Sequence, residues 1–284
     1  MNTAAEEPII ASSALTDKAL IWSEKGLSKP TSLFPGENII TSDGKLVPIK
    51  EIVDCGVRTT YRVILANGMR TDSTYGRKLL VDIDGRTVFK AVENIVPGDM
   101  VYTVSDPKHP AGANADSTDI SVDLMTLSRE TLKNVLTLLF ASTERNGEPR
   151  CDIEVTDEND VILSFQAASA EAASELQQTL LARFGVRSER FREQLTVSNE
   201  NLKLLGNKMD FLDVVYPKTS CQLSQEQLED LISLFWYSTD RQMVPVAVTD
   251  VSGKGRNQSY GIMLEDPSLD IVVDGMVSDT FKAL

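Results

Sequence analysis

The chain has 284 residues, with 28 Lys and Arg against 42 Asp and Glu, so its formal net charge is −14 and its pI is about 4.6. Such an acidic chain is a poor partner for nucleic acid, because phosphate binding depends on clustered Lys and Arg. No run reaches the ~18 apolar residues of a membrane span, so we expect no membrane partner. The single histidine, His109, excludes a pair of histidines on one metal ion.

The three cysteines, Cys55, Cys151 and Cys221, are odd in number and far apart in the sequence. Cysteines of this number and spacing are typical of proteins in a reducing compartment, and they form no metal-binding pattern. We therefore expect a cytoplasmic protein that holds no metal and no cofactor.

Residues 14–104, which follow an N-terminal arm over residues 1–13, are predicted to be all-β. Short runs of Val, Ile, Leu, Thr and Tyr alternate there with turn signals. The turn signals are Asp43-Gly44, Asn67-Gly68, Asp84-Gly85 and Pro97-Gly98. Asn-Gly and Asp-Gly favour hairpins, because both central residues of the turn must accept a positive φ. The spacing predicts a small, twisted β-fold of long hairpins.

The middle of the chain has a different pattern. Residues 105–122 are rich in Pro, Gly, Ala, Asp and Ser and are predicted to be a linker. Residues 123–243 combine amphipathic helices, such as one over 169–184, with short strands, which indicates an α+β domain. Residues 244–284 return to a β pattern. This order predicts a β-domain formed by both chain ends and interrupted by a second domain.

Individual side chains also have simple interpretations. Trp22 and Trp236 are both predicted to be core residues. The carboxylates of Glu265, Asp266, Asp270 and Asp274 could suggest a calcium loop, but they lack the regular spacing of its oxygen ligands. A solvated acidic edge is the favoured interpretation of that group.

Four short blocks follow one another along the two β segments. They are residues 14–27; Asn67-Gly68 with Thr74 and residues 79–81; residues 89–92 with 97–101; and Tyr260-Gly261-Ile262, Glu265-Asp266-Pro267 and residues 273–280. In order and spacing these blocks resemble those of inteins, in which a Hint splicing domain can be interrupted by a LAGLIDADG homing endonuclease. The resemblance implies a mixed fold: an all-β, horseshoe-shaped Hint-like domain from both chain ends, and an α+β LAGLIDADG-like domain over 123–243.

The resemblance places the N-terminal splicing junction at Ala14, which carries no nucleophile. Ser13 is one residue away and could serve only if the register slips. The family's Thr and His that polarise the scissile amide correspond to Thr74 and Arg77. An arginine cannot shuttle a proton, so this part of the splicing machinery is predicted to be degenerate.

The C-terminal junction is degenerate in the same comparison. The family's penultimate His corresponds to Ser278, and its cyclising Asn corresponds to Asp279. A carboxylate is a poorer cyclising nucleophile than a carboxamide, although some family members use Asp. Thr280 retains the hydroxyl of the acceptor residue that follows the junction.

The endonuclease-like segment also departs from its family. The resemblance places the metal-binding acidic positions near Glu144 and Asp240, each shifted by one residue, and the second half of the endonuclease is truncated. The only candidate basic face for nucleic acid is formed by Arg183, Arg187, Arg190 and Arg192, for which a solvated helix end is the favoured alternative.

These observations lead to three hypotheses. The favoured one is a catalytically inactive intein-like protein, not an enzyme, that acts as a structural or interaction module through a protein partner or self-association. It would be of phage or viral origin and act in the host cytoplasm or the virion. The alternatives are residual activity, either autoprocessing by Ser13 or Thr280 or nicking by Glu144 and Asp240, and a DNA-binding regulator derived from the LAGLIDADG half.

Overall fold

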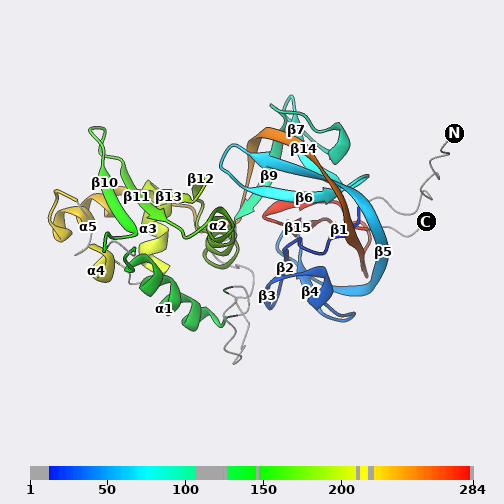
Figure 1. The fold of residues 1–284 in the computed structure, drawn as a ribbon, viewed down its shortest axis with the longest axis horizontal. Coiled ribbons are helices and arrows are strands. Elements are labelled where there is room, and N and C mark those ends of the chain that lie inside the picture. Colours follow the sequence, from blue (N-terminus) through cyan, green and yellow to red (C-terminus); the bar gives the residue numbers. More distant parts are fainter. Residues whose placement is uncertain are drawn as a thin grey trace.

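The protein is described by a computed structural model, which covers residues 13–105, 124, 127–144, 147–208, 212–216 and 221–281 (Figure 1). Within these residues, a 12-stranded sheet and a four-stranded sheet account for the strands, with helices mainly around the smaller sheet. The structure is therefore mostly β with some helices. No helix in these ranges is long and apolar enough to cross a membrane. His109 and nearly all of the predicted linker lie outside the described residues.

The larger sheet and its short connections form the β-body, which takes strands from both ends of the chain. Its elements are β1 (Leu15–Thr16), β2 (Ile21–Ser23), β3 (Gly26–Ser28), η1 (Pro30–Ser32), β4 (Asn38–Ile40), β5 (Leu46–Leu65), β6 (Arg70–Thr74), β7 (Lys78–Ile83), β8 (Arg86–Ala91), η2 (Val92–Asn94), β9 (Met100–Ser105), β14 (Gln242–Leu264), β15 (Ile271–Val273) and β16 (Met276–Ser278). Among the described strands the order is β14-β1-β6-β5-β4-β2-β15-β16-β9-β7-β8, with β3 beside β2.

Two long strands join the beginning of the chain to its end. β5 and β14 pair antiparallel from Leu65 opposite Val248 to Ile49 opposite Leu264, with register shifts along the way. The first part of β14 also pairs with β9. Register shifts of this kind bend and twist a strand, which lets β14 pair with β5 along one part of its length and with β9 along another.

The hairpin signals of the sequence are confirmed at two turns. Asn67-Gly68 connects β5 to β6 and Asp84-Gly85 connects β7 to β8, with φ of 79° at Gly68 and 77° at Gly85. Glycine is favoured at both positions because it accepts a positive φ without steric cost. Trp22 is fully buried in the β-body as predicted, but the prediction of a core position for Trp236 is wrong, because that side chain is 80% exposed.

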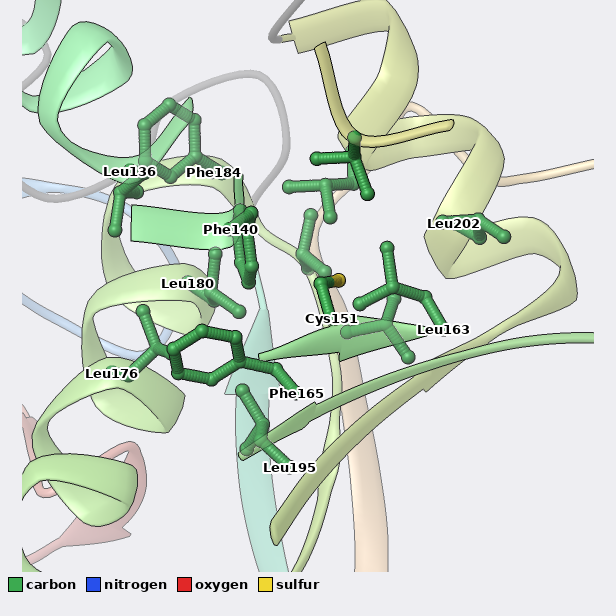
Figure 2. Packing of buried hydrophobic residues seen from close by; sticks show 14 of the residues in the cluster. Leu136, Phe140, Cys151, Leu163, Phe165, Leu176, Leu180, Phe184, Leu195 and Leu202 are labelled. Carbon is green, nitrogen blue, oxygen red and sulfur yellow. The ribbon is translucent and has the colours of Figure 1, made fainter. Parts of the chain in front are cut away.

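The middle of the chain forms the α+β body. Its elements are α1 (Arg129–Phe140), β10 (Cys151–Val155), β11 (Val161–Gln166), α2 (Ala170–Phe184), β12 (Glu189–Phe191), β13 (Gln194–Ser198), α3 (Asn199–Lys208), α4 (Leu212–Val215) and α5 (Gln225–Leu234). The smaller sheet has the order β10-β11-β13-β12 in the described residues. Its core includes an edge-to-face contact between Phe140 and Phe165, with ring centroids 5.2 Å apart (Figure 2).

Helix α2 has clear start and stop signals. The Ser169 side chain accepts a hydrogen bond from the Ala172 N–H, and Gly185 ends the helix with φ of 70°. Both features satisfy backbone groups that a helix leaves unpaired at its ends. The predicted apolar face, Leu176, Leu180 and Phe184, is buried in the α+β core (Figure 2).

The two bodies meet along α2, which stands between them in Figure 1. Leu181 belongs to the core cluster of the β-body, and the Gln177 side chain donates a hydrogen bond of 2.7 Å to the carbonyl of Asn67. On the neighbouring strand, the Arg190 N–H donates to the same carbonyl at 3.0 Å. Two elements of the α+β body, α2 and β12, therefore form hydrogen bonds with the β5–β6 turn.

Candidate functional site

The structure brings the predicted N-terminal and C-terminal junctions together. β1 pairs with β6 at Leu15 and Ser73, and β16 pairs with β7 at Ser278 and Leu79. Because β6 leads directly into β7, the residues that flank β1 and β16 meet. The result is a hydrogen bond of 2.5 Å from the Ser13 hydroxyl to Oδ2 of Asp279, across 266 positions of sequence.

Ser13 has two unusual properties. Its side chain and backbone are 2% exposed, and its φ is 91°, a positive value that residues with a side chain rarely adopt. Next to it, the hydroxyl of Thr74 donates a hydrogen bond to the carbonyl oxygen of Ala14. A strained backbone persists only where its surroundings hold it in place, and here Thr74 and Asp279 provide those contacts.

Each carboxylate oxygen of Asp279 accepts a hydrogen bond. Its Oδ1 accepts a hydrogen bond of 3.0 Å from the Lys78 N–H, while Oδ2 accepts the one from Ser13. Burial raises the pKa of the Asp279 carboxyl, and the bonds from Ser13 and Lys78 oppose that shift. A carboxylate with a raised pKa is a better proton acceptor than an ordinary surface aspartate.

Arg77 lies fully buried beneath this junction. Its Nε donates to the Ser278 hydroxyl at 2.8 Å and its Nη1 donates to the Ser73 hydroxyl at 3.1 Å. Its Nη2 is buried and has no hydrogen-bond partner among the described residues. Burial lowers the pKa of Arg77 to about 10, while Asp274 and Asp279 oppose the shift. The guanidinium therefore stays protonated at neutral pH.

The other two C-terminal positions are also buried. The Ser278 hydroxyl lies 3.0 Å from the carbonyl oxygen of Lys78 and 3.3 Å from that of Asp279. Thr280 is 2% exposed, and its hydroxyl donates to the carbonyl of Leu269 at 3.0 Å. Thr74, Arg77, Ser278 and Asp279 therefore bring polar side chains to the junction, and Ala14 contributes its carbonyl there. The Thr280 hydroxyl instead faces the carbonyls of Pro267 and Leu269. The roles of these residues in splicing stay predictions.

Asp274 is a buried acidic residue that the sequence interpretation missed. The structure buries it, whereas Glu265 and Asp266 are exposed, so the four acidic residues do not form one solvated edge. Asp274 accepts hydrogen bonds from the Leu20 N–H at 2.9 Å and from the Thr71 hydroxyl at 2.5 Å. Burial raises its pKa. The Asp274-Gly275 pair marks the hairpin turn between β15 and β16, but a turn signal does not show that the turn is buried.

The predicted endonuclease positions lie in the other body. Glu144 follows α1 and its N–H donates to the carbonyl of Glu148, whereas Asp240 is exposed just before β14. Among the residues that the structure describes, no group of three His, Cys, Asp or Glu is arranged to hold a metal ion.

The four arginines of the predicted basic face have different environments. Arg183 is 1% exposed and donates to the carbonyl of Leu127, and Arg190 donates to the carbonyl of Gly68. Arg187 is half-buried, and Arg192 lies over the ring of Phe191. The backbone contacts of Arg183 and Arg190 turn them towards the protein, so the four do not form one solvated cationic surface.

No protein-family model matches the chain, and no curated protein sequence matches it. Among solved structures, it is similar to a variant of the Ssp DnaB mini-intein, at 9% identity and a TM-score of 0.42 over 96% of this chain and 96% of that chain. It is also similar to the DnaX mini intein from Spirulina platensis, at 10% identity and a TM-score of 0.41 over 94% and 99% of the two chains. A DnaB intein from Synechocystis sp. PCC 6803 matches at 6% identity and a TM-score of 0.40 over 94% and 97%.

These matches correct one prediction. The structures just named are inteins, which process their own backbone, and this finding contradicts the prediction that the chain is not an enzyme. Nothing in the matches supports an inserted LAGLIDADG domain, so that part of the resemblance stays a prediction.

Proposed function

We propose that this chain is a self-processing protein of the Hint type, in which the Ser13 hydroxyl attacks the backbone carbonyl that precedes it. The observation that carries the proposal is the part-buried hydrogen bond between Ser13 and Asp279. A nucleophile in hydrogen-bond contact with a base is the arrangement that hydroxyl-based catalysis requires. Ser13, rather than Ala14, is then the first residue of the processing domain.

The first step is a shift of the acyl group from nitrogen to oxygen. Asp279 takes the proton of the Ser13 hydroxyl, and the oxygen adds to the carbonyl carbon of Ser12, a residue outside the described ranges. The bond from that carbon to the Ser13 nitrogen then breaks, and the nitrogen takes the proton from Asp279. The product is an ester, which water hydrolyses to release residues 1–12.

The second step concerns the bond from Asp279 to Thr280. The Asp279 carboxylate adds to its own backbone carbonyl, the bond to the Thr280 nitrogen breaks, and that nitrogen takes a proton from solvent. The product is a cyclic anhydride that water opens. This step follows from the resemblance to family members that end in Asp, and the hydrogen bond that joins Asp279 to Ser13 and the burial of Thr280 support it.

The remaining predictions concern other parts of the protein. The LAGLIDADG relationship of the α+β body, the protein partner or self-association, residual DNA binding or nicking, and the phage origin stay proposals from the sequence. The inward contacts of Arg183 and Arg190 favour a structural role for these two residues over phosphate binding.

The test is the intact mass of the purified chain after prolonged incubation, followed over time. The full-length mass of 31.2 kDa should decline as a fragment that lacks residues 1–12 accumulates. Ser13→Ala should abolish that fragment. Ser23→Ala provides the control, because it removes another buried hydroxyl, whose contacts lie within and beside the β2–β3 hairpin. A stable full-length mass, or equal cleavage in Ser13→Ala, would contradict the proposal.

A further inference from the structure

The guanidinium of Arg77 makes an incomplete set of hydrogen bonds for a fully buried group. Arginine donates bidentately through Nε and Nη2, which share one edge of the plane, as Arg62 does to the carboxylate of Asp72. In Arg77, Nε donates to Ser278 but Nη2 on the same edge has no partner in the described residues. An unpartnered buried donor is destabilising, so its presence requires an explanation, and a role in a reaction is one such explanation.

The Ser278 hydroxyl connects this guanidinium to a backbone carbonyl. Its oxygen accepts from Arg77 Nε at 2.8 Å and lies 3.0 Å from the Lys78 carbonyl oxygen and 3.3 Å from that of Asp279. One hydroxyl proton can serve only one of the two carbonyls at a time. Negative charge on the Asp279 oxygen would therefore draw the proton from Lys78 towards Asp279.

We propose that Ser278 and Arg77 act as one unit that stabilises negative charge on the carbonyl oxygen of Asp279 while the bond to Thr280 is cleaved. Ser278 is the catalytic residue of this unit, because its hydroxyl touches the reacting carbonyl. Arg77 is a positioning residue that acts through Ser278. The inference rests on the proposed function. It assigns the second step of that function to Arg77 and Ser278, which correspond to two histidines of the intein family.

The balance of charge supports this assignment. When Oδ of Asp279 bonds to the carbonyl carbon, the negative charge of the carboxylate moves to the carbonyl oxygen. The Arg77 guanidinium interacts electrostatically with the Asp279 carboxylate and is connected to its carbonyl oxygen through the Ser278 hydroxyl. The reaction therefore moves a negative charge beside a fixed cation and creates no new charge. Fixed donors of this kind are among the largest contributions to catalysis, because they need no reorganisation during the reaction.

The residue types determine how the unit works. Arginine does not give up its proton, and a serine hydroxyl does not ionise near neutral pH. The pair therefore polarises the carbonyl without transferring a proton. Its contribution to the rate should be independent of pH across the neutral range, whereas a histidine at either position would add its own titration.

The test compares two cleavages in the same full-length chain by intact mass: release of residues 1–12 and release of residues 280–284. Ser278→Ala should slow the second release by about 10²- to 10³-fold and leave the first within a few-fold. Arg77→Met should slow the second release similarly, and the double variant should be no slower than the slower single variant, because the two residues act as a unit. The ratio of wild-type to Ser278→Ala rates should not change with pH.

Matched controls separate this role from general destabilisation. Ser23→Ala removes a buried hydroxyl and Arg183→Met removes a buried guanidinium, both outside the junction, and both should release residues 280–284 at the wild-type rate. The inference is overturned if Ser278→Ala leaves the second release unchanged, slows both releases equally, or adds to Arg77→Met. It is also overturned if the wild-type chain releases residues 1–12 but never residues 280–284, a result that leaves the first step of the proposed function intact.

Discussion

Replacing Gly68 by alanine should destabilise the protein by more than the strain of its turn explains. Gly68 has φ of 79°, and a residue with a Cβ in a left-handed conformation costs about 1–2 kcal/mol. A Cβ at this position would also lie 2.3 Å from the carbonyl oxygen of Arg190 and 2.8 Å from its Cβ. These are atoms of β12 and not the end of a flexible side chain, so relieving the clash costs about 1–3 kcal/mol more.

Gly85 provides the matched control for this substitution. It follows an Asp in a two-residue hairpin turn, has φ of 77°, and a Cβ added there meets nothing within 4 Å. Gly85→Ala should therefore cost only the strain, and Gly68→Ala should exceed it by about 1–3 kcal/mol. The measurement is the free energy of unfolding of both variants by denaturant titration. Equal costs would show that β12 does not pack on the β5–β6 turn, and would refute the contact between the two bodies.

Three further predictions concern the junction and the cysteines. Asp279→Asn removes the proton acceptor of Ser13, so release of residues 1–12 should slow by about 10²- to 10⁴-fold. Release of residues 280–284 should accelerate in the same variant, because a carboxamide is the better cyclising nucleophile. Intact mass measures both rates. Burial raises the pKa of Asp279, and its ionised form is the base, so the rate of release of residues 1–12 should increase with pH. The rate should reach half its maximum at a pH above 3.8, the ordinary pKa of an aspartate. A rate that is constant across the acidic range would contradict this prediction. Cys151 is 1% exposed and burial raises its pKa, so an alkylating reagent should modify Cys55 and Cys221 well before it, as peptide mass mapping would show.

The sequence was sufficient for features that depend on neighbouring residues. The Asn67-Gly68 and Asp84-Gly85 turns and the start and end of α2 were all predicted, because each follows from local backbone preferences. The continuous length of β5 and β14 was not predicted. Register shifts let these strands bend, so that β14 pairs with both β5 and β9, and such shifts depend on the partner strand rather than on local sequence.

The site itself was harder to predict, because burial of a charged residue is a property of the whole fold. Arg77 and Asp274 are of residue types that usually lie at the surface, and only their placement between sheet segments from opposite ends of the chain buries them. Trp236 shows the converse error, since a large aromatic residue was assigned to a core that does not include it. Ser13 was identified in the sequence as one residue out of register, and the structure shows its contact with Asp279.

The most direct test of the central claim is the chemical form of the N-terminal fragment after the folded chain is treated with hydroxylamine. An ester on the Ser13 oxygen reacts with this nucleophile, so tandem mass spectrometry should find residues 1–12 ending in a hydroxamate at Ser12. The full-length mass should fall by the corresponding amount, and Ser13→Ala should abolish the fragment. An unchanged mass of 31.2 kDa, or a fragment with its cut elsewhere, would contradict the account.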